Sequence, residues 1–266
     1  MISYYKKAIL SITVLICQHM VQAQDFSAYK KEEFIHGSDT LRYRILYPEN
    51  YQPAKVYPLV MFLHGAGWRG NDNEQQLKEG AFLFLMDSVR KKHPAIVVFP
   101  QCPPDSMWFN IPPGPAYDTT VAFNHKMNTL ALSVPGQLVK LLMDSLASHK
   151  IADPKRIYLG GNSLGAFGGY DLIIHYPDYF AAAFIMCGQA NVELYPKKAA
   201  RLPLWIFHGS ADDIINVWPD RALYKALLQQ GARHVKYTEY PGLKHNIPPN
   251  VFAEPQLLTW LFSFKK

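Results

Sequence analysis

The sequence has few cysteines, no long apolar run and no cluster of metal-binding side chains, and each shortage excludes a class of protein. Of three cysteines in 266 residues, only Cys102 and Cys187 lie beyond the first 23 residues, each after its own apolar run. A disulfide framework is therefore excluded, and we expect two free, partly buried thiols. Histidines, cysteines and carboxylates do not occur at metal-ligand spacing, so neither a metal nor a cofactor is expected.

The apolar run near the N-terminus is too short to cross a membrane. Ala8 to Cys17 supplies ten residues, whereas a spanning helix needs about 20. Lys6 and Lys7 precede the run, and Val21-Gln22-Ala23 offers small residues at the positions that a signal peptidase reads. We interpret residues 1–23 as a cleaved signal and expect a secreted or periplasmic protein without a membrane span. A lipoprotein acylated at Cys17 is the alternative.

The sequence also lacks a continuous basic stripe. Its net charge of +6 falls by two when Lys6 and Lys7 leave with the signal. The remaining basic residues form short clusters, such as Arg90-Lys91-Lys92 and Lys197-Lys198, without interleaved aromatic residues. A nucleic-acid partner is therefore not expected.

What the sequence does contain is an alternation of β-rich and helix-like segments. The β-rich runs are 32–36, 41–47, 57–63, 95–99, 156–159, 181–186, 204–207 and 235–240. The helix-like segments are 74–92, which begins with capping residues, and 133–148, 167–175, 219–230 and 254–264. This alternation predicts an α/β fold: a mostly parallel sheet with an antiparallel N-terminal hairpin and helices on both faces.

A single domain is expected over residues 24–266, because no repeat or low-complexity linker divides them. The longest irregular piece, 103–128, contains five prolines and follows the strand predicted at 95–99. Ligands of parallel sheets bind beyond the carboxyl ends of the strands. We therefore expect this loop to lie over the active site.

A serine lies where a β-rich run passes directly into a helix-like one. Gly161-Asn162-Ser163-Leu164-Gly165 follows the run 156–159, and apolar residues at helical spacing continue to Pro177. The Gly-x-Ser-x-Gly pattern alone is weak, but its place on a strand-turn-helix junction is typical of a nucleophilic serine. Ser163 is the candidate nucleophile, and a turn that only connects strand to helix is the alternative.

A nucleophilic serine needs a base, and His245 is the candidate. In the chain order serine, acid, histidine, only His234 and His245 lie beyond the plausible acids. His234 begins the strand predicted at 235–240, whereas His245 follows it and so lies at the carboxyl end. The alternative role for His245 is that of a hydrogen-bonded loop histidine.

The acid that orients the base has three candidates. Asp212 and Asp213 come directly after the strand predicted at 204–207, and Glu193 lies farther out in a polar loop. Neighbouring side chains leave a turn in different directions, so only one of the two aspartates can face the imidazole. Asp212 and Asp213 are not distinguished by these features alone.

An oxyanion hole needs two backbone N–H donors. Leu164 supplies one as the residue after the serine, and the loop after the strand predicted at 57–63 supplies the other, with Ala66 first and Gly67 second. A simple turn is the alternative for this loop.

Aromatic residues of the two loops are candidates for substrate binding. Trp108, Phe109 and Tyr117 belong to the long loop, and Trp68 stands beside the expected oxyanion loop. They form either a wall of an acyl or aromatic pocket, or anchors that hold the loops to the body. Trp108 and Trp68 are the named substrate-binding candidates.

Five stretches of the chain together resemble a known family. They cover roughly residues 30–262 and read LRYRILYPENYQPAKVYPLVMFLHGAGWRGNDNEQQLKEG, VVFPQCPP, RIYLGGNSLGAFGGYDLIIHYPDYFAAAFIMCGQA, HGSADDIINV and YPGLKHN. They are similar to secreted bacterial α/β-hydrolases of the dienelactone hydrolase/phospholipase-carboxylesterase type, and to carbohydrate and feruloyl esterases.

The resemblance implies the α/β-hydrolase fold and a triad of Ser163, Asp212 and His245. It chooses Asp212 because the acid of the His-Gly-x-x-Asp pattern is the first aspartate. It also implies structural roles for His64 and His208. Asn216, Lys244 and Ala166 depart from the family pattern without removing a reacting group, so these departures concern the shape of the substrate and leave the chemistry intact.

The sequence therefore predicts a secreted serine hydrolase of carboxylic esters. The expected partner is a small-molecule or polysaccharide-linked ester, with acetyl and feruloyl groups as examples. A serine peptidase of prolyl-oligopeptidase-like type would use the same three residues and is the alternative. An acyltransferase would also use them. A non-catalytic carbohydrate-binding protein is disfavoured by the intact serine, acid and histidine.

Overall fold

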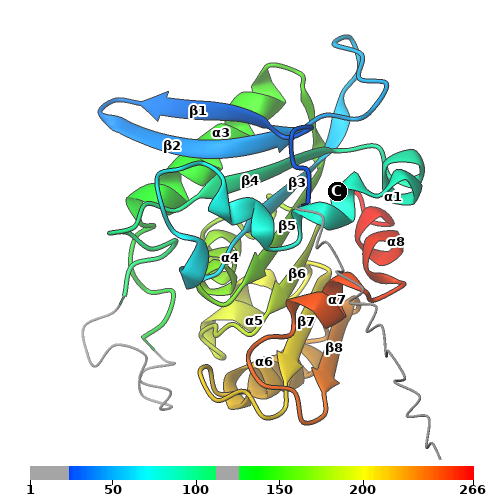
Figure 1. The fold of residues 1–266 in the computed structure, drawn as a ribbon. Coiled ribbons are helices and arrows are strands. Elements are labelled where there is room, and N and C mark those ends of the chain that lie inside the picture. Colours follow the sequence, from blue (N-terminus) through cyan, green and yellow to red (C-terminus); the bar gives the residue numbers. More distant parts are fainter. Residues whose placement is uncertain (1–23, 112–125) are drawn as a thin grey trace, which may run out of the picture.

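An eight-stranded sheet forms the centre of the computed structural model, which describes residues 24–111 and 126–266 (Figure 1). Across the sheet the strands lie in the order β1-β2-β4-β3-β5-β6-β7-β8. In chain order they are β1 (Lys30–His36), β2 (Asp39–Leu46), β3 (Tyr57–Leu63), β4 (Ile96–Gln101), β5 (Ala152–Asn162), β6 (Ala182–Met186), β7 (Leu204–Gly209) and β8 (Val235–Tyr240). The predicted signal, 1–23, lies outside the described residues.

The first strands run against their neighbours, and the others run together. β1 pairs antiparallel with β2, and β2 pairs antiparallel with β4. The five remaining pairs, from β4-β3 to β7-β8, are parallel. Gly37 closes the β1-β2 turn with a φ of 62°, a backbone region that glycine enters without steric cost. The predicted parallel sheet with an antiparallel N-terminal hairpin is confirmed.

Helices cover both faces of the sheet (Figure 1). Alternate residues of β3 point to opposite faces, with Leu59 and Met61 in one apolar core and Val60 and Phe62 in the other. The first core includes α3 (Val134–Ser148), α4 (Leu164–His175), α5 (Leu194–Ala199) and α6 (Trp218–Gln229). The second includes the 3-10 helices η2 (Gln75–Lys78) and η3 (Ala81–Leu85), with α7 (Pro248–Phe252) and α8 (Leu257–Phe262).

The single helix predicted over 74–92 is wrong. The segment contains η2, η3 and then α1 (Asp87–Lys92). Gly80 interrupts it with a φ of 87°, and a Cβ at this position would lie 2.2 Å from the ring of Phe252. This left-handed residue ends one helical path and starts another. The helix predicted over 254–264 is shorter in the structure, where α8 covers Leu257–Phe262.

Both cysteines of the described chain are free, as predicted, and they are fully buried rather than partly buried. Cys102 follows β4 and Cys187 follows β6. β3 and β5 lie between these two strands in the sheet. The sheet order therefore keeps the two thiols apart.

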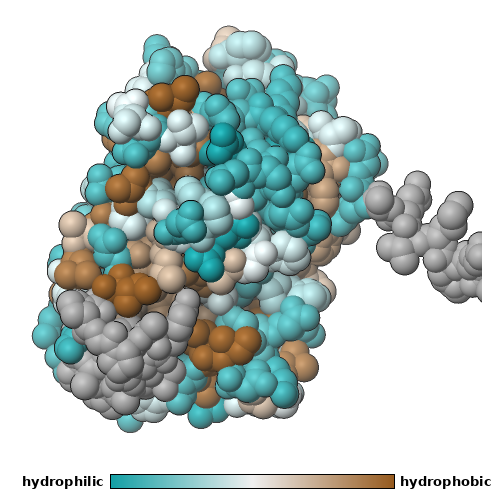
Figure 2. Space-filling view, turned by 60° about the vertical axis from the view of Figure 1, so that its left-hand side comes forward, coloured by the Kyte–Doolittle hydropathy of each residue, from teal (hydrophilic) through white to brown (hydrophobic). Residues whose placement is uncertain are grey.

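The surface of the described residues carries scattered apolar side chains. Figure 2 shows one face, on which they form several separate patches. Among the most exposed are Ile35, at 67%, and Ile214, at 62%. In the described part of the chain, every helix is too short or too polar to cross a bilayer.

The carboxyl ends of the parallel strands bring distant loops to one edge of the sheet. β3 leads to the 3-10 helix η1 (Ala66–Trp68), and β5 leads to Ser163. β7 and β8 are followed by Asp212 and His245. Because β5 lies beside β3 in the sheet, the loops after these two strands meet.

Candidate active site

Ser163 stands on a sharp turn between β5 and α4. Its φ of 51° and ψ of −116° are strained for a residue with a side chain. A Cβ at Gly165 would lie 1.9 Å from the carbonyl oxygen of Leu63, and one at Gly161 would lie 2.4 Å from the carbonyl oxygen of Gly165. Both glycines are therefore required by the close approach of β3, the turn and α4. The Ser163 N–H donates to Met186 O at 2.9 Å, which ties the turn to β6.

The fold brings Ser163, His245 and Asp212 into one hydrogen-bonded line. His245 Nε2 lies 2.9 Å from Ser163 Oγ, and His245 Nδ1 lies 2.7 Å from Asp212 Oδ2. Asp213 instead accepts from Lys244 Nζ at 2.8 Å on the surface. With Nδ1–H donating to the carboxylate, His245 Nε2 is free to accept the serine proton.

Asp212 is held as an ionised carboxylate. The backbone N–H groups of Ile214 and Ile215 each donate to Oδ1 at 2.9 Å. Burial acts to raise the pKa of Asp212, but hydrogen bonds from His208, His245 and these amides outweigh it and hold the pKa well below its usual range. The side chain of Asp212 is 0% exposed, so water does not compete for His245.

The predicted oxyanion donors stand at the same edge. Leu164 begins α4, where the N–H has no partner within the helix, and Ala66 begins η1. Among the described residues, the amides of Ala66, Gly67 and Leu164 have no backbone acceptor outside the regular helices and strands. The geometry is thus compatible with Leu164 and with either residue of the η1 loop as donors.

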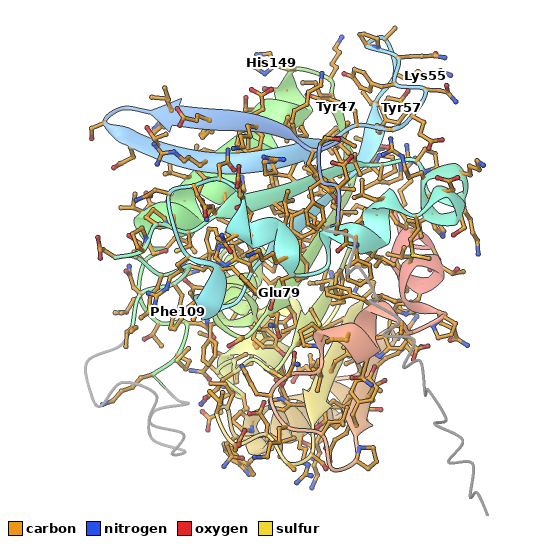
Figure 3. All side chains as sticks on the ribbon, viewed as in Figure 1. Tyr47, Lys55, Tyr57, Glu79, Phe109 and His149 are labelled. Carbon is orange, nitrogen blue, oxygen red and sulfur yellow. The ribbon has the colours of Figure 1, made fainter. Side chains whose placement is uncertain are left out.

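A buried carboxylate, Glu79, joins the loop that begins η1 to the turn that carries Ser163. Glu79 Oε2 accepts from the Gly65 N–H at 2.6 Å, and Oε1 accepts from Asn162 Nδ2 at 2.6 Å. Gly65 precedes Ala66, and Asn162 precedes Ser163. Burial raises the pKa of Glu79, and hydrogen bonds from these groups act in the opposite direction. Figure 3 shows Glu79 near the middle of the fold.

The sequence leaves two roles open for Trp108, a wall of a substrate pocket or an anchor of the loop, and its contacts are those of an anchor. It is 0% exposed, its Nε1–H donates to His64 O at 3.0 Å, and its ring lies 5.2 Å from the His64 ring. A Cβ at Gly168 would lie 2.2 Å from Trp108 Cβ, so α4 packs directly on the tryptophan. Phe109 is also buried and stacks on Phe167 at 5.1 Å. These contacts are those of an anchor for the loop, and the role of Trp108 in substrate binding stays a prediction.

Trp68 is half-buried beside the η1 loop. Lys78 Nζ lies 5.8 Å from the centre of the Trp68 ring. The Trp68 side chain acts to lower the pKa of the buried Glu79. Part of the indole surface stays accessible. Tyr117 and most of the long loop lie outside the described residues.

A group with metal-ligand chemistry occurs beside Asp212. Donor atoms of Cys187, His208 and Asp212 lie within 4.8 Å of one another. Both His208 ring nitrogens are engaged, with Asp220 Oδ2 at 2.7 Å and with Ile215 O at 3.1 Å. The group is explained by hydrogen bonds among its members and their neighbours.

No sequence pattern indicates a role for Glu79 or Asp220. Glu79 belongs to a stretch that was expected to be an ordinary amphipathic helix. Asp220 stands in the first turn of α6, where an acidic residue is common for its interaction with the helix dipole. A local pattern has no means of revealing that each side chain points into the protein.

Comparisons with known proteins point to esterases. The model of the Esterase family, described as "Putative esterase", matches residues 38–239. A protein of rice (Oryza sativa subsp. japonica) named "Probable carboxylesterase" is 24% identical over 209 residues, which cover 73% of this chain and 83% of the rice protein.

Solved structures of esterases share the fold. A thermostable esterase is 30% identical with a TM-score of 0.77; the match covers 90% of this chain, which spans only 64% of that esterase. A ferulic acid esterase from Anaeromyces mucronatus, solved in complex with ferulic acid, is 16% identical with a TM-score of 0.58 over 82% of this chain and 84% of its own. The sheet order and these likenesses identify the α/β-hydrolase fold.

Proposed function

The chain belongs to the Esterase family, and from this premise we propose that it cleaves carboxylic esters through an acyl-enzyme on Ser163. The observation that carries the proposal is the line of two hydrogen bonds, 2.7 and 2.9 Å long, from Asp212 through His245 to Ser163. This line ends at a serine with strained backbone angles, directly before the first residue of α4.

In the first half of the reaction, Ser163 Oγ attacks the ester carbonyl carbon while His245 Nε2 takes the hydroxyl proton. Asp212 keeps the imidazole in the required tautomer and stabilises its positive charge. The amides of Ala66 and Leu164 hold the negative charge that develops on the carbonyl oxygen. The C–O bond to the alcohol then breaks, and His245 returns its proton to the leaving oxygen.

In the second half, water takes the place of the alcohol. His245 removes a proton from water as it attacks the acyl-enzyme, and then gives this proton to Ser163 Oγ as the acid leaves. Every proton moves between His245, Ser163 and the substrate or water, so the cycle ends with the starting enzyme.

We extend the proposal to esters carried by polysaccharides, with acetyl and feruloyl groups as the acyl class. The support is the fold shared with a ferulic acid esterase and the partly accessible ring of Trp68 beside the proposed oxyanion loop. A flat indole is suited to contact an aryl group or the apolar face of a sugar.

The test is a set of initial rates for the purified protein and for Ser163→Ala on p-nitrophenyl acetate, p-nitrophenyl octanoate, methyl ferulate and a peptide p-nitroanilide. We expect hydrolysis of acetate or ferulate, no cleavage of the anilide, and a loss in kcat on the order of 10⁶ in Ser163→Ala. An organophosphonate probe should label the wild type and not the variant.

Ser148→Ala is the matched control, because this serine is exposed at the end of α3 and its Oγ donates only to Ser145 O. It should keep wild-type rates and labelling. Appreciable esterase activity in Ser163→Ala would exclude the serine mechanism. Serine-dependent anilide cleavage would instead favour a peptidase, and labelling without turnover would favour an ester outside the panel.

A further inference from the structure

His208, at the end of β7, lies against the proposed acid Asp212 but has a second buried carboxylate on its other side. Its Nδ1 lies 2.7 Å from Asp220 Oδ2, and its Nε2 lies 3.2 Å from Asp212 Oδ2 and 3.1 Å from Ile215 O. The side chains of His208, Asp212 and Asp220 are all 0% exposed. The Asp212 oxygen that faces His208 is the same one that accepts from His245 Nδ1.

The partners of His208 require a proton on each ring nitrogen. A neutral imidazole donates from one nitrogen and accepts at the other, but all three partners here are acceptors. The lone pair of a neutral His208 would face either a carboxylate or a carbonyl oxygen among side chains that are 0% exposed. Such an unpaired contact is costly, and an imidazolium removes it.

His64 provides an internal comparison, since it also precedes a glycine at the end of a strand and is also 0% exposed. Its Nε2 accepts from the Cys102 N–H at 3.0 Å, and its Nδ1 lies 2.7 Å from Gly65 O. One donor and one acceptor suit a neutral ring. Burial accordingly lowers the pKa of His64 to about 4.

For His208, burial also acts to lower the pKa, but the hydrogen bonds to Asp212 and Asp220 outweigh it and raise the pKa to about 10. Tyr170 donates to Asp220 Oδ1 at 2.9 Å, so the second carboxylate is fixed from the far side by α4. The ionisable groups around the ring and its two carboxylates are Asp212 after β7, Asp220 on α6, Tyr170 on α4, Cys187 after β6, Tyr237 and Glu239 on β8, and His245 after β8.

We propose that His208 is a positioning residue: a buried imidazolium that holds the Asp212 carboxylate toward His245 and balances the charge of Asp220. The proposal rests on the proposed function, in which His245 is the base. Asp212, His208 and Asp220 then carry a net charge of −1, which becomes zero when His245 takes the serine proton. With a neutral residue at 208, the negative charges of Asp212 and Asp220 would be uncompensated. They would then stabilise the protonated form of His245 too strongly for its role as the base.

The first test uses nuclear magnetic resonance of the ¹⁵N-labelled protein and requires no activity. His208 should carry a proton on both ring nitrogens between pH 6 and 8, and His64 should carry one. A single ring N–H on His208 at neutral pH would overturn the proposal. Because this readout is independent of catalysis, it stands even if Ser163→Ala disproves the serine mechanism.

The second test separates the charge of His208 from its hydrogen bond. In His208→Gln, the side-chain Nε2 can still donate to Asp212, but the positive charge is absent. We expect the acid limb of kcat/KM to move to higher pH by about 1 unit and kcat to fall about tenfold with KM unchanged. In the double variant His208→Gln/Asp220→Asn, the net charge returns to −1, and the acid limb should return toward that of the wild type.

His149→Gln is the matched control, because this histidine lies at the C-terminal end of α3, away from the site, and Figure 3 labels it at the outer rim. Its pH profile should equal that of the wild type. If His208→Gln folds and has an unchanged pH profile, or if the double variant does not restore it, His208 only fills space and the proposal is wrong.

Discussion

Glu79 supports the geometry of the proposed site and has no part in the proposed chemistry. One carboxylate accepts from the residue before Ala66 and from the residue before Ser163, both at 2.6 Å. The proposed oxyanion donor and the proposed nucleophile are thus held together by a single side chain. Small shifts between them matter, because an oxyanion hole acts through donors aimed at the developing charge.

Replacing Glu79 by alanine should damage turnover more than binding. Gly65 N–H and Asn162 Nδ2 would lose their acceptor inside the protein, at about 1–3 kcal/mol each. We expect kcat to fall about 10² to 10³, as for the loss of one oxyanion donor, with KM little changed. Steady-state kinetics on p-nitrophenyl acetate and urea unfolding measure the two effects.

Glu79→Gln refines this prediction. Asn162 Oδ1 has no partner among the described residues, so its amide can turn and accept from the new glutamine while Gly65 still donates. This variant should stay within about tenfold of wild-type kcat. Glu74→Gln is the surface control, because Glu74 forms an exposed ion pair with Lys31. It should change the free energy of unfolding by less than about 0.5 kcal/mol. Equal losses in Glu79→Gln and Glu79→Ala would mean that charge, rather than position, is what matters.

At the scale of elements, α4 is placed by what packs on its first two turns. Gly165 admits the β3 loop and Gly168 admits Trp108, so the helix approaches both without side chains between them. The long loop begins after β4 and reaches α4 through Trp108 and Phe109. The loop is therefore tied to the helix that carries Leu164.

Trp108→Ala tests this anchoring. Removal of a fully buried indole should destabilise the fold by about 3–5 kcal/mol. Any loss of activity should be the same for aryl and acetate esters, because the ring contacts the protein and not the substrate. Trp108→Phe loses chiefly the indole hydrogen bond and should cost about 1 kcal/mol. A rise in KM for methyl ferulate alone would instead restore Trp108 to the substrate pocket.

For the whole molecule, the two buried histidines predict how stability depends on pH. His64 is neutral when folded, with a pKa of about 4 against 6.5 when unfolded, so the unfolded chain binds an extra proton between these values. The free energy of unfolding should therefore fall as pH drops from 6.5 to 4. His208 has a folded pKa of about 10, so its contribution is present below pH 6.5 and is lost as pH rises toward 10.

The expected result is a maximum of stability near pH 6.5. Urea unfolding followed by tryptophan fluorescence at pH 4, 6.5 and 9.5 measures it. His208→Gln should flatten the alkaline side and leave the acid side as it is. Stability that stays constant or rises from pH 7 to 9.5 in the wild type would contradict a charged His208.

Most of the architecture was predictable because it follows from local patterns. The alternation of β-rich and helical segments predicted the parallel sheet, and the turn at Gly37 predicted the hairpin. The helix over 74–92 failed because its apolar spacing says nothing about Phe252, the distant ring that leaves no room for a Cβ at Gly80. The signal segment and the centre of the long loop remain predictions.

The sequence by itself determined the strands and most of the helices, since these depend on residues close together along the chain, and it also displayed the chain order of serine, acid and histidine. Local features did not separate Asp212 from Asp213; the family resemblance favoured Asp212, and the tertiary structure places it against His245 while Asp213 pairs with Lys244. Only the tertiary structure decided that Trp108 is buried and that Glu79 joins two loops. His64 and His208 show why: both stand in a His-Gly pair, and only the partners that folding brings to each ring make one neutral and the other charged.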